Sequence, residues 1–256
     1  MELQVREEGF LITSSSRALV VTAVPVERDA VARAFAPGAQ EVALPGAVLH
    51  RVHGGPDLLA AGVGPGRAAA ATASALTAAA LRGAPYGLVV CAGIAGGFAP
   101  HAPVGSLVVA DEIIAADLGA ETPDGFLPVA DLGFGTSAHR PPASLVRDLA
   151  DATGARTGAV LTVSTATGGA ARATELRARH PQALAEAMEG FGVAEAAAAH
   201  GTPAVEVRAV SNPVGPRDRA AWRIGDALTA LTEGFAALAP VLESWRVGDA
   251  HDRSTR

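Results

Sequence analysis

The chain of 256 residues contains no lysine, and all 20 of its basic residues are arginine. Without lysine, it has no amine for a Schiff base, no P-loop lysine and no kinase-type lysine. Its single cysteine, Cys91, excludes an internal disulfide and a multi-thiolate metal site. Because Cys91 ends the apolar run Leu88–Cys91, we predict a small buried side chain there. The seven histidines form no pair at metal-binding spacing on a helix, so we predict no metal and no cofactor.

Long apolar runs and positive charge are also missing. No run reaches membrane-spanning length, and the net charge of −6 argues against nucleic acid or an anionic membrane as the main partner. Aromatic residues make up 4% of a chain that is 49% hydrophobic, which predicts a sizeable core of Ala, Val and Leu. Residues 1–17 have no basic end followed by a long apolar stretch, so they do not resemble a secretory signal. We interpret them as a disordered extension or a start codon placed too early, residues 247–256 as a tail, and the protein as cytoplasmic.

Short β-branched runs bounded by Gly or Pro alternate with helical patterns along the chain. The predicted strands are Ala18–Val24, Ala47–Val52, Leu58–Ala61, Gly87–Ala92, Ser106–Ile114, Ala159–Val163 and Ala204–Val210. The predicted helices are Pro25–Phe35, Arg67–Leu81, Ala143–Ala152, Ala170–Arg179, Glu189–His200 and Arg219–Trp245. This alternation predicts one α/β domain over residues 18–246, with three αβα layers and a mixed, largely parallel sheet. The Gly/Pro-rich stretch Leu118–Pro142 is the longest irregular segment, and loops of that length are usually functional or disordered.

The segment Val205–Arg219 begins as an alternating strand and reaches Ser211-Asn212 just before a Pro/Gly-rich loop. A polar side chain at the end of a strand in an α/β sheet points into the crevice where ligands bind. An amide offers one acceptor and two donors, which suits the N7/O6 edge of a 6-oxopurine. A carboxylate would better suit the N7/N6 edge of adenine. Asn212 precedes proline, however, and taken alone this pattern favours an ordinary turn.

Two further candidates follow predicted strands. Glu27 falls in the first turn of a helix opened by Pro25, where its carboxylate either stabilises the helix dipole or activates a water in the crevice. The glycine-rich turn Gly93–Gly97 follows a buried strand and would let the backbone approach a ligand closely. It lacks the G-x-G-x-x-G pattern and the acidic residue of dinucleotide sites, which excludes a nicotinamide cofactor there.

A third candidate, Met188-Glu189, lies at a strand-to-helix junction. The Glu189 carboxylate either caps the helix or accepts hydrogen bonds from both hydroxyls of a ribose. Met188 would then pack on the apolar face of the sugar, or else it belongs to the core.

Four of these elements occur in an order that resembles the nucleoside phosphorylase/nucleosidase family: Ala23–Glu27, Gly93–Phe98, Ala187–Gly190 and Ser211-Asn212. The resemblance spans roughly Ala18–Trp245, and its most specific part is Ala187-Met-Glu189 followed by Arg208–Asn212. Within the family, Thr22–Arg28 and Ser211–Arg219 are similar to the futalosine hydrolase branch, which acts in menaquinone biosynthesis. The resemblance implies a nucleoside phosphorylase-like fold, a small nucleoside substrate, and a homodimer or larger homo-oligomer.

The resemblance also implies a role for each matching residue. Glu27 would activate the attacking water, Asn212 would hydrogen-bond the purine as it leaves, and Glu189 would bind the ribose, with Met188 against the sugar. The remaining contacts implied are Val63 on the ribose side, Gly93 and Ile94 in the glycine turn, Thr165, Ala166 and Thr167 along the base, and Trp222 over the 5′ substituent. Arg217 is available for the carboxylate of the futalosine tail, or is exposed loop charge.

Three departures from the family pattern bear on the reaction. Asn212 stands where adenine-specific relatives have Asp, which makes methylthioadenosine and adenosylhomocysteine poor candidates. Ala166 replaces a stacking Phe. Ile94 is apolar and Glu27 would repel phosphate, which favours water as the nucleophile. The resemblance thus implies hydrolysis of futalosine to hypoxanthine and dehypoxanthine futalosine. A purine nucleoside phosphorylase, a methylthioadenosine/adenosylhomocysteine-type nucleosidase and a non-catalytic nucleoside-binding protein stay as alternatives.

Overall fold

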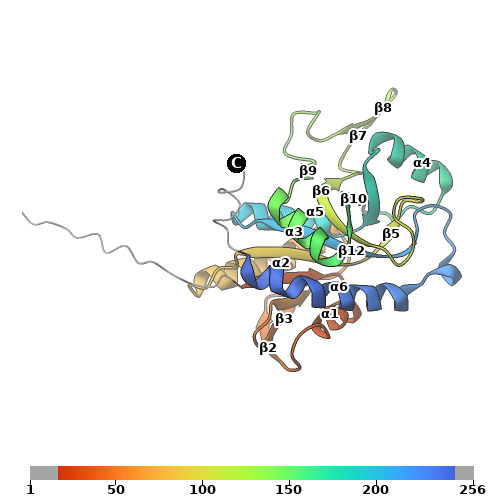
Figure 1. The fold of residues 1–256 in the computed structure, drawn as a ribbon. Coiled ribbons are helices and arrows are strands. Elements are labelled where there is room, and N and C mark those ends of the chain that lie inside the picture. Colours follow the sequence, from red (N-terminus) through yellow and green to blue (C-terminus); the bar gives the residue numbers. More distant parts are fainter. Residues whose placement is uncertain (1–16, 246–256) are drawn as a thin grey trace, which may run out of the picture.

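The computed structural model describes residues 17–245. They form three layers, with a ten-stranded mixed sheet between two layers of helices (Figure 1). The strands are β1 (Ala18–Thr22), β2 (Ala39–Leu44), β3 (Ala47–Val52), β4 (Asp57–Ala60), β5 (Leu88–Gly97), β6 (Leu107–Ala115), β9 (Ala138–His139), β10 (Arg156–Thr162), β11 (Ala183–Ala187) and β12 (Ala204–Pro213). A separate hairpin pairs β7 (Gly119–Thr122) with β8 (Gly125–Pro128). The helices are α1 (Pro25–Ala32), α2 (Pro65–Leu81), α3 (Ala143–Thr153), α4 (Ala170–Arg179), α5 (Gly190–Ala199) and α6 (Ile224–Ser244), with a 3₁₀ turn at Arg219–Ala221.

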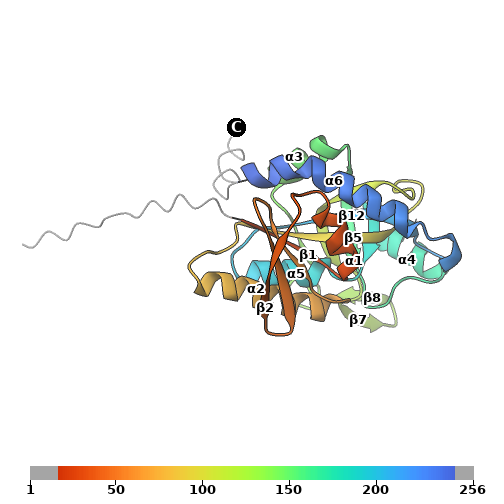
Figure 2. The same ribbon diagram turned by 90° about the horizontal axis from the view of Figure 1, so that it is seen from below.

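Helices cover both faces of the sheet. Residues of α1, α3 and α6 share one core cluster with β1, β5 and β12, whereas α2 and α5 pack on the opposite face. Figure 2 shows α3 and α6 along one side of the sheet and α2 and α5 along the other. Every residue of β1 is buried, as expected of a strand covered on both sides. The predicted three-layer α/β fold with a mixed sheet is confirmed.

The sheet closes on itself at one end. Its order is β11-β10-β6-β12-β5-β1-β4-β3-β2, and β11 also pairs with β5. Strands β5, β12, β6, β10 and β11 therefore form a closed ring, and β1, β4, β3 and β2 extend from β5. In the closing pair, Ala185 lies opposite Gly97 and Glu186 opposite Gly96. The ring thus brings the end of β11 beside the end of β5, where the site is found.

Several predicted boundaries were wrong. The expected turn Gly93–Gly97 is the second half of β5, because this stretch pairs with β12 along its whole length. The last helix begins at Ile224 rather than at Arg219, after the 3₁₀ turn. Part of the irregular stretch Leu118–Pro142 is ordered as β7, β8 and β9.

Strand β2 was not predicted, and β11 was implied only by the strand-to-helix junction at Met188-Glu189, without bounds. Strand β2 is largely exposed and contains Gln40 and Glu41, and β11 is the Ala/Leu/Glu sequence of a helix former held extended by its neighbours. Apart from Arg17, the predicted extension 1–17 and tail 247–256 lie outside the described residues. Within residues 17–245, no helix combines the length and hydrophobicity needed to cross a bilayer.

Candidate active site

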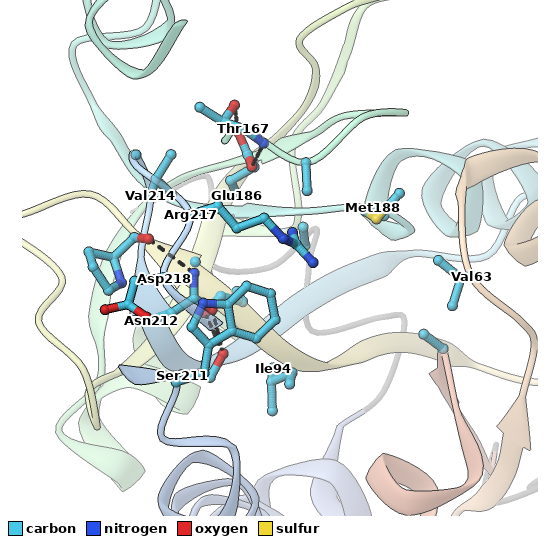
Figure 3. Close-up of a pocket in the computed structure, with 18 of the residues that line it drawn as sticks. Val63, Ile94, Thr167, Glu186, Met188, Ser211, Asn212, Val214, Arg217 and Asp218 are labelled. Atoms are coloured by element: carbon cyan, nitrogen blue, oxygen red, sulfur yellow. Dashed lines mark hydrogen bonds between the residues drawn. The ribbon is translucent and has the colours of Figure 1, made fainter. Parts of the chain in front are cut away.

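A cavity of about 330 Å³ opens at the carboxyl ends of six strands (Figure 3). Its walls come from the residues after β1, β4 and β10, the second half of β5, the end of β11, and the segment Ser211–Trp222. The carboxyl ends of the strands are where open α/β sheets bind ligands. The lining includes four carboxylates, from Glu27, Glu186, Glu189 and Asp218, and one guanidinium, from Arg217.

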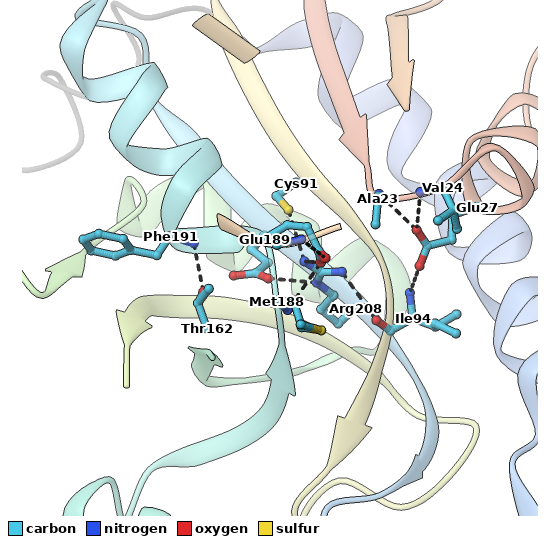
Figure 4. A network of polar contacts seen from close by, with 12 residues as sticks. Ala23, Val24, Glu27, Cys91, Ile94, Thr162, Met188, Glu189, Phe191 and Arg208 are labelled. Carbon is cyan, nitrogen blue, oxygen red and sulfur yellow. Dashed lines mark hydrogen bonds and ion pairs between the residues drawn. The ribbon is translucent and has the colours of Figure 1, made fainter. Parts of the chain in front are cut away.

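Glu27 lies in this cavity and is almost fully buried (Figure 4). Its Oε2 accepts hydrogen bonds from the backbone N–H groups of Ala23 and Val24, at 3.1 and 3.2 Å. Its Oε1 accepts from the Ile94 N–H at 2.9 Å, across the gap between α1 and β5. The contacts to Ala23 and Val24 support the start of α1, but the contact to Ile94 belongs to the cavity. Burial raises the pKa of Glu27, against the lowering effect of the Arg208 charge.

Arg208 is the centre of the buried polar network behind the cavity. It is 1% exposed and donates from Nε to Glu206 Oε1 at 2.8 Å and from Nη2 to Glu189 Oε2 at 3.2 Å. The same Nη2 lies 3.2 Å from Sγ of Cys91, and burial raises the pKa of that thiol, which stays neutral. A fully buried guanidinium needs such anionic partners to offset its loss of hydration.

Glu206 is the most deeply buried acid of the network. Its exposed fraction is 0%, and its Oε2 has no hydrogen-bond partner among the residues that the structure describes. Burial raises the pKa of Glu206, while Arg208 lowers it. Glu206 also explains the glycine that begins α5, because a Cβ on Gly190 would lie 2.0 Å from Glu206 Oε2.

Glu189 occupies the N-cap position of α5, yet its side chain makes no capping hydrogen bond. Its Oε1 accepts from the Gly64 N–H at 3.2 Å, and its Oε2 accepts from the Met188 N–H at 3.3 Å in addition to Arg208. The start of α5 is fixed instead by Phe191, whose N–H donates to Thr162 Oγ1 at 2.9 Å (Figure 4). The carboxylate therefore serves the cavity and the buried network rather than the helix end.

Asn212 lies near the end of β12, next to a register shift against β5. Its Oδ1 is 2.9 Å from the Ser211 hydroxyl, which donates, and its Nδ2 donates to the Pro213 carbonyl at 3.0 Å (Figure 3). One N–H of the amide and one lone pair of its oxygen have no partner among the residues described. The residue is thus part of a strand rather than of a turn, and it keeps a donor and an acceptor for a ligand.

The segment after Asn212 covers one side of the cavity. The Val214 N–H donates to the Gly97 carbonyl at 2.8 Å, and the Arg217 N–H donates to the Gly168 carbonyl at 3.2 Å. The guanidinium of Arg217 lies 5.0 Å from the ring of Trp222, so the cation and the aromatic face form one unit. Both side chains line the cavity.

The model of the phosphorylase superfamily matches residues 17–242. This chain belongs to the phosphorylase superfamily. A futalosine hydrolase of Streptomyces coelicolor is 75% identical to it over 228 residues, which cover 89% of this chain and 97% of that protein. A futalosine hydrolase of Acidothermus cellulolyticus is 47% identical over 229 residues, covering 88% of this chain and 91% of that protein. The family resemblance inferred from the sequence is confirmed.

Solved structures show the same fold. The native futalosine hydrolase of Helicobacter pylori has a TM-score of 0.74 to this chain, at 17% identity over 88% of this chain and 97% of that one. The 5′-methylthioadenosine/S-adenosylhomocysteine nucleosidase of the same organism has a TM-score of 0.75, at 17% identity over 88% of this chain and 98% of that one. This member of the phosphorylase superfamily thus has the predicted nucleoside phosphorylase-like fold.

Most of the residues selected from the sequence meet in one cavity of this superfamily member. Those that line it are Glu27, Val63, Ile94, Ala166, Thr167, Met188, Glu189, Asn212, Arg217 and Trp222. Thr165 is exposed and lies outside the lining, whereas Ala166 and Thr167 line the cavity. Gly93 lies behind the cavity wall, where a Cβ would come within 2.6 Å of Glu27 Oε1 and 2.7 Å of Arg208 Nη1.

The sequence reasoning gave no role to Arg208, Glu206, Glu186 or Asp218. Glu206 and Arg208 did leave a signal, because they stand two positions apart in an otherwise apolar strand and so share one face. A charged pair on one face of a buried strand needs partners, and that requirement points to a polar network.

Proposed function

We propose that this chain hydrolyses the N-glycosidic bond of futalosine, releasing hypoxanthine and dehypoxanthine futalosine in menaquinone biosynthesis. One observation carries the proposal. Two buried carboxylates, from Glu27 and Glu189, and the amide of Asn212 line the same cavity. Asn212 lies at the end of β12, the strand next to β5. The high identity to a futalosine hydrolase supports the choice of substrate.

Water is the nucleophile in this proposal. The residues of the lining near Glu27 are Ala23, Val24, Ile94 and Ala95, which offer no cationic side chain for phosphate. A phosphate there would face the Glu27 carboxylate and be repelled. A water could instead donate to a free lone pair of that carboxylate, which would take its proton as the water attacks C1′.

The other residues stabilise the two charges that develop as the bond breaks. Positive charge grows on the sugar, whose hydroxyls Glu189 would hold so that water and C1′ approach closely. Negative charge grows on the purine, where the free N–H of Asn212 would donate to N7 or O6. Arg208 holds Glu189 in place from behind, through the hydrogen bond from its Nη2 to Glu189 Oε2.

Arg217 and Trp222 fit the other end of futalosine. The 5′ tail of this nucleoside ends in a benzoate, and the pair offers an aromatic face beside a guanidinium. Arginine binds carboxylates well because its planar N–H groups match two oxygens. The tail carboxylate would therefore be held by Arg217 at the mouth of the cavity.

One experiment tests the function. The protein is incubated with futalosine and with inosine, with and without phosphate, and hypoxanthine is followed. We expect release from futalosine that does not depend on phosphate. Strict phosphate dependence with a ribose 1-phosphate product would instead identify a phosphorylase, and binding without release would identify a nucleoside-binding protein.

We further propose that the enzyme works in the cytoplasm as a homodimer or larger homo-oligomer, as the family resemblance implies. Sedimentation velocity and cell fractionation test these two points. A monomer at micromolar concentration would contradict the first, and recovery outside the cytoplasm would contradict the second.

A further inference from the structure

Glu186 lines the cavity, but its carboxylate has no role in the proposed reaction. It lies on β11 and is 7% exposed, and both of its oxygens bind a single residue (Figure 3). The Thr167 N–H donates to Oε1 at 2.8 Å, and the Thr167 hydroxyl donates to Oε2 at 2.5 Å. Hydrogen bonds to a carboxylate are stronger than neutral ones, especially away from water. Burial raises the pKa of Glu186, and the two bonds from Thr167 act against that rise.

Within residues 17–245, the segment that carries Thr167 has one other carboxylate contact, from Asp117, whose Oδ2 accepts from the Ser164 N–H at 2.6 Å. Thr167 lies between β10 and α4 in a segment without regular secondary structure, where Thr165 and Gly168 are exposed. Ala166 and Thr167 nevertheless form one wall of the cavity. A wall without a backbone ladder needs side-chain anchors, and Glu186 supplies two contacts to it.

The same segment also contacts the segment after Asn212, which covers one side of the cavity. The carbonyl of Gly168, next to Thr167, accepts the Arg217 N–H at 3.2 Å. Arg217 in turn packs on Trp222. A continuous chain of contacts therefore runs from Glu186 through Thr167 and Gly168 to the loop at the cavity mouth.

The sheet ties Glu186 to the residue proposed to bind the purine. Gly96 of β5 is paired with Glu186 of β11 on one side and with Asn212 of β12 on the other. The backbones of Glu186 and Asn212 are therefore fixed relative to each other across one strand. Whatever Glu186 holds is thereby placed at a set position relative to Asn212.

We propose that Glu186 is a positioning residue, which holds the Thr167 segment against Asn212 so that the two walls fit a purine base between them. This inference rests on the proposed function. Glu186 would act through Thr167, because each of its two oxygens accepts a hydrogen bond from that residue.

The test compares Glu186→Ala, which removes both contacts, with Glu186→Gln, which can keep them. A glutamine oxygen accepts from the Thr167 N–H, and its NH₂ donates to the Thr167 hydroxyl. Glu175→Ala is the matched control, since Glu175 lies nearby on α4 and is exposed. The readouts are kcat/KM on futalosine, inhibition by hypoxanthine, and hydrogen exchange of the Thr167 and Arg217 amides.

We expect Glu186→Ala to lower kcat/KM roughly 10- to 100-fold and to weaken hypoxanthine inhibition by a similar factor. Amide exchange should speed up at Thr167 and at Arg217. Glu186→Gln should recover most of each property, and Glu175→Ala should match the wild type. Thr167→Val should give a smaller loss than Glu186→Ala, because it removes only the hydroxyl contact and keeps the backbone one. It should add little to Glu186→Ala, which already removes both contacts.

Two results would overturn the proposal. The first is unchanged exchange at Thr167 and unchanged hypoxanthine inhibition in Glu186→Ala. The second is a changed preference between futalosine and its 6-amino analogue in Glu186→Gln, which would mean that Glu186 reads the base directly. Failure of the wild type to release hypoxanthine would sink the proposed function instead, and the exchange data would still decide whether Glu186 holds Thr167.

Discussion

Arg208 donates from Nη2 to Oε2 of Glu189 across 3.2 Å, and both side chains are almost completely shielded from solvent. The guanidinium thereby compensates the charge of a carboxylate that also lines the cavity. Its Nη1 lies on the side of Gly93, whose missing Cβ leaves room for both Arg208 and Glu27. The one buried charge of Arg208 thus acts on both Glu189, proposed to bind the ribose, and Glu27, proposed to activate the water.

The first prediction concerns Glu27. Replacing it by Gln removes the proposed base, and loss of a general base costs roughly 10²–10⁴-fold in rate. KM should change far less than kcat, as measured by steady-state kinetics on futalosine. One caution is structural: the new NH₂ would face an N–H from Ile94, Ala23 or Val24, so the melting temperature is measured alongside. Near-normal turnover in a folded variant would leave Glu27 with only its role at the start of α1.

The second prediction concerns pH. Burial raises the pKa of Glu27, although Arg208 and the Ile94 N–H oppose the rise. As a base, Glu27 works only when ionised, so kcat/KM should fall as the pH is lowered through this raised pKa. The acid limb should therefore lie at higher pH than expected for an exposed glutamate. A profile of kcat/KM against pH checks this, and full activity down to the ordinary range of an exposed carboxyl would contradict it.

The third prediction concerns the choice of base. Asn212 can donate to O6 or N7 of hypoxanthine, whereas an ionised Asp would repel O6 and a protonated Asp would suit N7 of adenine. A mismatched polar group in a closed site costs on the order of 1–3 kcal/mol. Asn212→Asp should lower the rate on futalosine and narrow or reverse its advantage over the 6-amino analogue. The quantity to compare is the ratio of the two kcat/KM values, and an unchanged ratio would show that Asn212 does not read the base.

The fourth prediction separates Arg217 from ordinary surface charge. Arg217→Gln should raise KM for futalosine about tenfold, in line with the loss of a charged hydrogen bond. The KM for inosine, which has no tail carboxylate, should not change. Arg219→Gln is the control, because Arg219 is exposed on the 3₁₀ turn and lies outside the cavity lining. Equal effects on both substrates would argue that Arg217 only orders the loop.

The fifth prediction concerns stability. A Cβ on Gly190 would lie 2.0 Å from Glu206 Oε2, so Gly190→Ala must displace the acid that orients Arg208. Overpacking of this kind typically costs about 1–3 kcal/mol. Gly66→Ala is the matched control, since a Cβ there meets nothing within 4 Å and Gly66 also lies in the first turn of a helix. Urea unfolding should show a loss for Gly190→Ala and none for Gly66→Ala; equal stabilities would contradict the clash.

The sequence indicated the residues that follow strands, because a strand's end is visible in its pattern. Glu27, Met188, Glu189 and Asn212 were all found in this way, and they line one cavity. The irregular segment after β10 has no periodicity, so nothing in it showed that Thr167 points inward while Thr165 is exposed.

The missed parts depend on contacts between distant segments. Strand β11 has helix-forming residues and is extended only because β10 and β5 pair with it. Glu206 and Arg208 share a face of β12 in the sequence pattern, but the other partners of Arg208, Cys91 and Glu189, come from other elements. No local pattern carries that information.

The ring of strands determines what local unfolding of β11 would do to the site. Glu186, Met188 and Glu189 all sit at the end of β11, which closes the ring against β5. Proteins open locally in cooperative units. A fluctuation that detaches β11 would remove the anchor of the base wall and the ribose carboxylate in the same event. Partial unfolding there would therefore give a fully inactive protein rather than one with relaxed selectivity.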